Sequence, residues 1–370
     1  MKTGNMTKSQ YSPGHKINFS GGPAALPPEV FQQASAAVLD YEGTGLSILE
    51  IGHRSKEFTA ILEESNALVK ALCGIGDDYE VLWLHGGGRL QFCMIPMNFL
   101  GQNDTAGYID SGHWAAEAAE YAMHYGGTDI VCTSRDASYR HLPKWPGDIP
   151  ANLSYLHYTS NNTIYGTQWH HVPKCNVPLI ADMSSDIFSK KMDYGNCALF
   201  YAAAQKNIGP AGATLVVIRK DMLDVVKRDL PPMLSYKAQA ASRSVLNTSP
   251  VFAIYTSLLT LRWTKEKGIA AIEADNRIKA KMLYDEVARN ELFELVVDEA
   301  EDRSLMNVCF RAVNDAEEKS FVSFCEKHNI AGIKGHRFVG GFRVSLYNAV
   351  TVGQVELLIN VMKEFEHSGV

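Results

Sequence analysis

Several features are absent from this 370-residue sequence, and each absence excludes a class of protein. No stretch reaches the roughly 18 consecutive apolar residues that a membrane-spanning helix needs. Residues 1–16 lack the apolar centre of a secretory signal. The seven cysteines are scattered and include no C-x-x-C pair, which is typical of reduced thiols. We therefore expect a cytoplasmic protein with no metal site and no membrane association.

The chain also lacks an excess of positive charge. Its 35 lysines and arginines are outnumbered by 41 aspartates and glutamates, and the formal net charge is −6. Proteins that bind a nucleic-acid backbone without sequence preference are usually basic, so we expect no nucleic-acid partner. Any site that binds an anion through lysine or arginine must therefore be a local cluster of these residues. The 46% of apolar residues is enough for a sizeable buried core.

No internal repeat or low-complexity linker interrupts the first 219 residues, in which short apolar runs alternate with helical patterns. Helices are predicted over 55–73, after the glycines at 86–88, and from about residue 114. The apolar runs that predict strands are 81–84, 106–109, 129–132, 155–158, 178–181, 199–203 and 214–218. This alternation predicts an α/β fold whose mostly parallel, seven-stranded sheet carries helices on both faces.

The pattern changes after residue 219. Residues 250–290 are helical almost throughout, with a break expected at Gly268. A strand at 307–312, a helix at 317–328, a strand at 341–347 and a helix at 351–365 follow. We predict a flexible leader (1–16), a large domain (17–265) and a small C-terminal α+β domain (266–370), and we allow for packing of the start of the large domain with the small one.

Lys206 is the most informative single residue. It follows the apolar run 199–203 and precedes the Gly-Pro-Ala-Gly turn at 209–212, with no acidic residue nearby in sequence. Burying an unpaired ammonium is costly or lowers its pKa. Such a lysine is suited to act as an amine nucleophile that forms a Schiff base. On this segment alone, a lysine that simply reaches solvent is an equal alternative.

Asp182 decides between these alternatives. It stands directly after the buried run 178–181, and neighbouring parallel strands would deliver Asp182 and Lys206 to the same edge of the sheet. A carboxylate can keep a pyridine nitrogen protonated, and a lysine can bind the aldehyde of the same ring. Together they indicate pyridoxal 5′-phosphate (PLP). Alone, Asp182 would be interpreted as a helix N-cap.

Three weaker signals accompany this pair. Glycines 86–88 and Arg89 follow a strand and could place backbone amides around an anion, although the segment is neither a Walker loop nor G-x-G-x-x-G. Trp114 could stack on a cofactor ring, and Thr163 could bond a ring substituent. The plainer interpretations are a tight turn, a core tryptophan and a loop threonine.

The chain resembles the phosphoserine aminotransferase family, class V aminotransferases on the PLP fold type I scaffold. The resemblance runs from Ile17 to about Gly369. It rests on the motifs NFSGGPAALP (18–27), GHRSKEF (52–58), AQKNIGPAG (204–212), NTSP (247–250), GHR (335–337) and GGFRVSLYN (340–348).

This resemblance implies a PLP enzyme in which Lys206 is the Schiff-base lysine and proton shuttle and Asp182 is the partner of the pyridine nitrogen. The other cofactor-binding residues that it implies are Gly88, Arg89, Trp114, Thr163, Gln205, Asn247 and Thr248. The last two match a pair that the family contributes from the neighbouring subunit. A homodimer whose active sites are shared between subunits is therefore implied.

The resemblance also implies the reaction. Phosphoserine and 2-oxoglutarate would give 3-phosphooxypyruvate and glutamate by ping-pong transamination in serine biosynthesis, with 4-phosphooxy-L-threonine as a further substrate in pyridoxine biosynthesis. Arg343 would bind the α-carboxylate, for which a forked guanidinium is suited. The implied clamp on the distal phosphate or carboxylate is His53, Arg54, His336 and Arg337. A solvated basic patch is the alternative interpretation of these four residues.

One position departs from the family pattern, because Leu90 stands where a glycine is usual. We expect Leu90 in the first turn of a helix, where leucine is acceptable. A related alanine:glyoxylate-type transaminase or a cysteine desulfurase would keep Lys206 and Asp182 without the His-Arg pairs, and a desulfurase would also need a cysteine on a mobile loop. A binding protein that has kept the fold would lack a yellow, borohydride-reducible chromophore.

Overall fold

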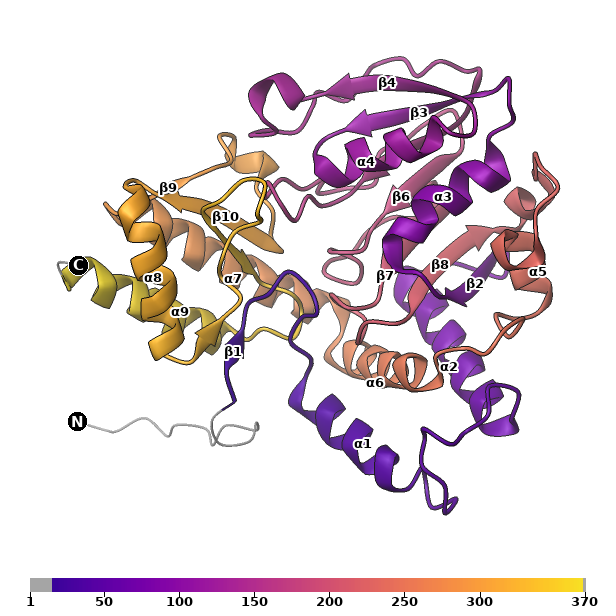
Figure 1. Cartoon of the computed structure of the whole chain (residues 1–370), viewed down its shortest axis with the longest axis horizontal. Coiled ribbons are helices and arrows are strands. Elements are labelled where there is room, and N and C mark those ends of the chain that lie inside the picture. Colours follow the sequence, from indigo (N-terminus) through magenta and orange to yellow (C-terminus); the bar gives the residue numbers. More distant parts are fainter. Residues whose placement is uncertain (1–14, 369–370) are drawn as a thin grey trace.

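The computed structural model describes residues 15–368, so nearly all of the expected leader lies outside the described residues. A seven-stranded sheet forms the centre of the larger part (Figure 1). Its strands are β2 (Tyr79–Leu84), β3 (Thr105–Asp110), β4 (Gly127–Thr133), β5 (Leu153–Thr159), β6 (Leu179–Asp182), β7 (Leu199–Ala203) and β8 (Thr214–Arg219). The order is β2-β8-β7-β6-β5-β3-β4. Only β8 runs antiparallel to its neighbours, so the prediction of a mostly parallel seven-stranded sheet is confirmed.

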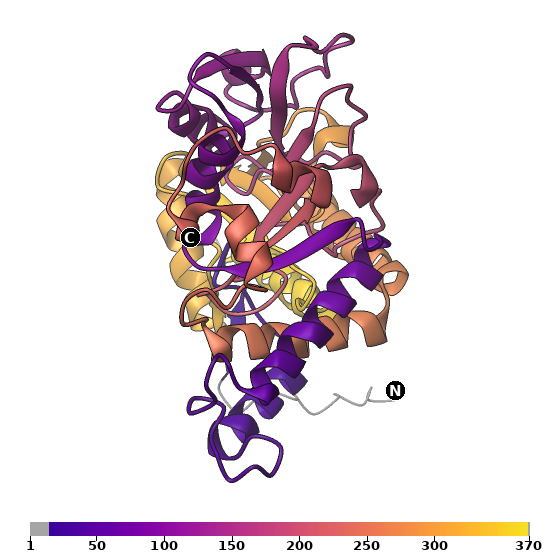
Figure 2. The ribbon, with the colours of Figure 1, turned by 90° about the vertical axis from the view of Figure 1, so that its right-hand side faces the viewer.

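Helices cover both faces of this sheet (Figures 1 and 2). Val81 and Trp83 of β2 face a core shared with α2 (Lys56–Cys73) and α6 (Val251–Lys267), and α1 (Pro28–Leu39) packs on α6. Leu82 and Leu84 face the opposite core, which contains α3 (Gly87–Phe99), α4 (His113–Ala122) and α5 (Tyr236–Ala241). Alternate residues of a strand thus fill two separate cores, as a sheet buried on both faces requires.

Local signals set the helix ends where the sequence predicts them. The Ser55 side chain accepts a hydrogen bond from the Phe58 amide at the start of α2, and Gly74 ends the helix in the left-handed conformation with φ 64°. Gly268, with φ 79°, separates α6 from α7 (Ile269–Arg289), which confirms the expected break.

The smaller part has its own core. An antiparallel sheet of β9 (Phe293–Leu295), β10 (Asn307–Ala312) and β12 (Phe342–Ser345) packs with α7, α8 (Asp315–Lys327) and α9 (Val352–His367). The strand β1 (Ile17–Asn18) pairs with β11 (Ile330–Ala331), and Phe19 lies in this second core. The start of the chain therefore crosses to the C-terminal part, and we propose the domain boundary near residue 266.

Several elements lie outside the predicted segments. The buried positions of α1 are Val30, Ala34 and Ala37, and alanines give a weak periodic signal. Strands β1, β9 and β11 have two or three residues each, too few for any period. Short 3₁₀ helices lie at Arg135–Ala137, Tyr194–Asn196, Lys220–Asp224, Pro232–Leu234 and Ala300–Asp302. Across residues 15–368 no helix is both long enough and apolar enough to span a membrane.

Candidate active site

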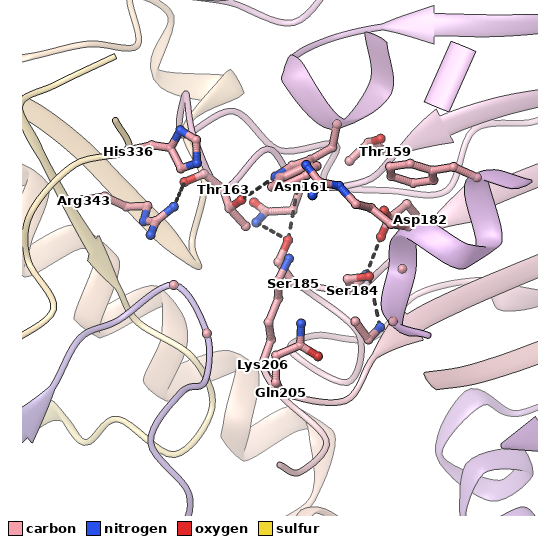
Figure 3. A pocket seen from close by; sticks show the side chains of 18 of the residues that line it. Thr159, Asn161, Thr163, Asp182, Ser184, Ser185, Gln205, Lys206, His336 and Arg343 are labelled. Carbon is pink, nitrogen blue, oxygen red and sulfur yellow. Dashed lines mark hydrogen bonds between the residues drawn. The ribbon is translucent and has the colours of Figure 1, made fainter. Parts of the chain in front are cut away.

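A cavity of about 400 Å³ opens at the carboxyl ends of β5, β6 and β7 and between the two parts of the molecule (Figure 3). Of the residues predicted for the site, those that line it are Gly88, Arg89, Trp114, Thr163, Asp182, Gln205, Lys206, His336 and Arg343. Lys206 extends into the cavity between Arg343 and His336 on one side and Asp182 on the other. Asp182 and Lys206 thus line one cavity at the strand ends, as expected from their positions after neighbouring strands.

Lys206 is held on a tight turn directly after β7. Its amide donates to the Ala204 carbonyl at 2.7 Å, and the Gly209 amide donates to the same carbonyl at 2.8 Å. Burial lowers the pKa of the Lys206 amine, Arg343 lowers it further, and Asp182 opposes the shift. The amine therefore loses its proton at a lower pH than an exposed lysine, as a nucleophilic amine requires.

Asp182 ends β6, which pairs with β7 as neighbouring strands of the parallel sheet. Its side chain is 7% exposed, and Oδ1 accepts a hydrogen bond from the Ser184 amide at 2.9 Å. A turn follows and no α-helix begins at this point of the described chain, which argues against the N-cap interpretation. The carboxylate is thus fixed at the cavity wall with one oxygen held by the backbone.

The glycine-rich turn forms the N-terminus of α3. Gly86 and Gly87 have φ of 86° and 66°, whereas Leu90 lies in the first helical turn, so the expectation for Leu90 is confirmed. In the described chain no side chain caps this helix end. The first-turn amides, including those of Gly88 and Arg89, are therefore available to an anion in the cavity.

Arg89 and Trp114 make contacts that the sequence did not predict. The Arg89 guanidinium forms an ion pair with Glu117, with 3.0 Å between Nη2 and Oε1, and lies 5.1 Å from the Trp114 ring centre. Part of its charge is therefore already balanced. Trp114 Nε1 donates to Thr163 Oγ1 at 3.2 Å, which leaves the threonine hydroxyl free to donate into the cavity.

Arg343, on β12, brings a guanidinium from the small part to the cavity. Its Nη1 donates to the Thr163 carbonyl at 3.4 Å, while its buried Nε has no hydrogen-bond partner among residues 15–368. A Cβ on Gly21 would lie 2.4 Å from Nη2, so the glycine of the NFSGG segment leaves room for this side chain. Burial and the neighbouring Arg343 lower the pKa of His336 and favour its neutral form.

The amino-acid sequence of the chain matches known proteins over nearly its whole length. The sequence model of the family described as aminotransferase class-V matches residues 17–358. A phosphoserine aminotransferase of Flavobacterium psychrophilum is 47% identical over 354 residues, which are 95% of this chain and 99% of that protein. This chain belongs to the phosphoserine aminotransferase family of class V aminotransferases.

Solved structures of this family match the fold as well. The phosphoserine aminotransferase of Bacillus circulans subsp. alkalophilus is 41% identical, with a TM-score of 0.92 over 96% of this chain and 99% of that one. A PLP-bound phosphoserine aminotransferase of Trichomonas vaginalis is 33% identical, with a TM-score of 0.86 over 94% and 100% of the two chains. The chain is thus an aminotransferase, and PLP is the cofactor of its class.

Five residues predicted for this aminotransferase site do not line the cavity of the single chain: His53, Arg54, Asn247, Thr248 and Arg337. Arg54 and Thr248 are exposed, and His53 Nε2 is buried without a partner in the described part of the chain. The Arg337 guanidinium lies 4.9 Å from the Phe338 ring centre.

Other residues line the cavity of this aminotransferase but were not predicted, among them Thr159, Asn161, Ser184 and Ser185. They lie at the end of β5 or shortly after β5 and β6. Like Asp182, all four stand at or just after the end of a predicted strand, so their position in the sequence could have identified them.

Proposed function

We propose that this chain transfers the amino group of O-phospho-L-serine to 2-oxoglutarate in a PLP-dependent reaction, which gives 3-phosphooxypyruvate and L-glutamate. The observation that carries the proposal is that Lys206, Asp182 and Arg343 face a single cavity. The names of the relatives support the choice of phosphoserine.

The residues of the cavity fit PLP in chemistry and in placement. Lys206 offers an amine for the aldehyde, Asp182 a carboxylate for the pyridine nitrogen, and Trp114 an aromatic face. The uncapped amides at the start of α3 suit the phosphate, and Gly88 in its first turn lines the cavity. Gln205 and the Thr163 hydroxyl complete the proposed set for the phosphate and the ring oxygen.

The proposed reaction assigns one task to each central residue. When bound, PLP supplies an aldehyde that takes up the amino group and a ring that accepts the electron pair left at the substrate α-carbon. With its neutral amine, Lys206 would take the proton from this carbon and deliver it to the carbon of the cofactor aldehyde, for which its lowered pKa is suited. Asp182 keeps the pyridine nitrogen protonated. The first product leaves before the second substrate binds, so ping-pong kinetics are expected.

Arg343 is the proposed partner of the substrate α-carboxylate. Its buried, unpartnered Nε and its fork geometry suit a bidentate contact with a carboxylate. His336 adjoins it in the cavity, and Arg337, His53 and Arg54 would complete the site for the distal phosphate or carboxylate.

We propose that a second copy of the chain supplies the His53 and Arg54 part of this clamp and also two residues of the cofactor-binding set. His53, Arg54, Asn247 and Thr248 stand outside the cavity of their own chain, as expected for residues that serve a neighbouring subunit. Exposed apolar side chains that precede the 52–58 segment in the sequence support such an interface: Leu39 is 83% exposed and Leu49 63%.

A complementation experiment tests this sharing. Neither Arg54→Ala nor Lys206→Ala should be active alone with phosphoserine. After the two variants are unfolded and refolded together, each mixed dimer holds one intact site, so about a quarter of wild-type activity should return. No recovery, with mixed dimers verified by differently tagged chains, would show that Arg54 and Lys206 do not meet across subunits.

A coupled assay tests the proposed reaction itself. Purified protein with PLP, phosphoserine and 2-oxoglutarate should form glutamate, whereas serine and alanine should be poor donors because they lack the phosphate. Adding 4-phosphooxy-L-threonine measures whether the site also accepts that donor. Equal rates with alanine and phosphoserine would overturn the assignment of the substrate.

A further inference from the structure

A buried polar pair lies beneath Asp182 on the face of the sheet that packs against α3 and α4. Tyr201 of β7 is the register partner of Asp182 in β6, and its side chain is 0% exposed. Register partners on neighbouring strands point to the same face. His157 of β5, 1% exposed, points to this face too, and its Nε2 lies 3.1 Å from the Tyr201 hydroxyl. These two side chains lie outside the cavity lining, so neither touches a ligand there.

The hydrogen-bond directions in this pair follow from one unpaired atom. His157 Nδ1 is buried and has no partner in the described structure. Buried N–H groups without an acceptor are rarer than unpaired acceptors, so the proton of the neutral imidazole belongs on Nε2. Nε2 then donates to the Tyr201 oxygen. The phenol proton of Tyr201 is left free to turn toward Asp182, its register partner on β6. Burial and then Asp182 raise the pKa of Tyr201.

The carboxylate of Asp182 is then held from two sides. Oδ1 accepts from the Ser184 amide at 2.9 Å, and the register of β6 with β7 places the Tyr201 side chain next to Asp182 on the same face of the sheet. We propose that Tyr201 is a positioning residue of the transamination site, which orients Asp182 and keeps it ionised, with His157 fixing the direction of the tyrosine hydroxyl. This inference rests on the proposed role of Asp182 toward the pyridine nitrogen.

Several other titratable groups lie around Asp182, and a variant of Tyr201 must leave them in place. Lys206 and His157 interact with Asp182, as does the buried Asp186, which is held by Ser160 and Gln168. Tyr201→Phe leaves these groups in place and removes one donor to the carboxylate. Because a hydrogen-bond donor favours the ionised form of a carboxylate, its loss should move the acid limb of the rate profile to higher pH.

The test uses the holoenzyme of Tyr201→Phe and a matched control. In Tyr201→Phe the acid limb of the kcat/KM profile should move up by about one pH unit, kcat should fall about tenfold, and the pH titration of the bound-cofactor absorbance should shift in the same direction. Tyr108→Phe removes a hydroxyl from the same buried layer, where it shares a 2.8 Å hydrogen bond with Tyr155. That control should keep the wild-type profile and spectrum.

Replacement of His157 tests the direction of the network. Although glutamine lacks the aromatic ring, His157→Gln keeps an N–H near the Nε2 position and should retain the wild-type profile, whereas His157→Phe should reproduce the shift of Tyr201→Phe. Wild-type profiles and spectra for both Tyr201→Phe and His157→Phe would overturn the inference. The absorbance titration is measured without an amino-group substrate. It therefore still tests the inference if phosphoserine proves not to be the substrate.

Discussion

Replacement of Asp182 by asparagine isolates the charge of the proposed pyridine partner. The substitution keeps the shape of the side chain and leaves an amide oxygen that can still accept from the Ser184 amide. Asp182 is 7% exposed, so the lost charge is a buried one. Breaking a buried ion pair costs about 3–5 kcal/mol, and kcat should therefore fall between about 10²- and 10⁴-fold. Cofactor should remain bound, since Lys206 and the α3 amides are unchanged.

The assay is the single-turnover rate with phosphoserine, followed through the absorbance of the bound cofactor. Asp110→Asn is the matched control, because Asp110 ends β3 at the same edge of the sheet, is 2% exposed, and accepts from Thr133 and Arg135 rather than from groups in the cavity. The control should keep kcat within about threefold, although its stability should fall. A wild-type rate for Asp182→Asn would refute the role of its charge.

The remaining predictions concern the substrate arginine and the buried histidine. Arg343→Lys keeps the charge but loses the fork, so kcat/KM for phosphoserine should fall about 10- to 100-fold in steady-state assays, chiefly through KM. Gly21→Ala should raise KM in the same assay, because its Cβ would lie 2.4 Å from Arg343 Nη2, while Gly353→Ala, whose Cβ meets nothing within 4 Å, should not. Burial lowers the pKa of His157 from 6.5 to about 4. The folded protein then binds fewer protons than the unfolded chain between these values, so acidification from about pH 6.5 to 4 should cost about 3 kcal/mol of unfolding free energy, a loss that His157→Gln should lack in denaturant titrations.

The sequence predicted those features that depend on periodicity and on strand ends. The apolar runs before Asp182 and Lys206 predicted two neighbouring strands. Because the carboxyl ends of parallel neighbours lie at the same edge of the sheet, the two residues were expected to lie close together, as they do. The break at Gly268 followed from a glycine within a long helical pattern. Leu90 fell in a helical turn because the positive φ angles lie at Gly86 and Gly87.

Features that depend on pairing between distant segments were not predictable from these patterns. The ion pair of Arg89 with Glu117 and the bond of Trp114 to Thr163 arise only when β2, β3 and β5 bring together the helices and the loop that follow them. A buried tyrosine in an apolar strand, such as Tyr201, looks like core packing until its register partner is known.

The most direct test of the account is to find which lysine binds the cofactor aldehyde. Holoenzyme is reduced with borohydride and its peptides are mapped by mass spectrometry. We predict a pyridoxyl group on Lys206 and none in Lys206→Ala. Labelling at another buried lysine, such as Lys190, which donates to the Trp169 carbonyl at 3.0 Å, would contradict it.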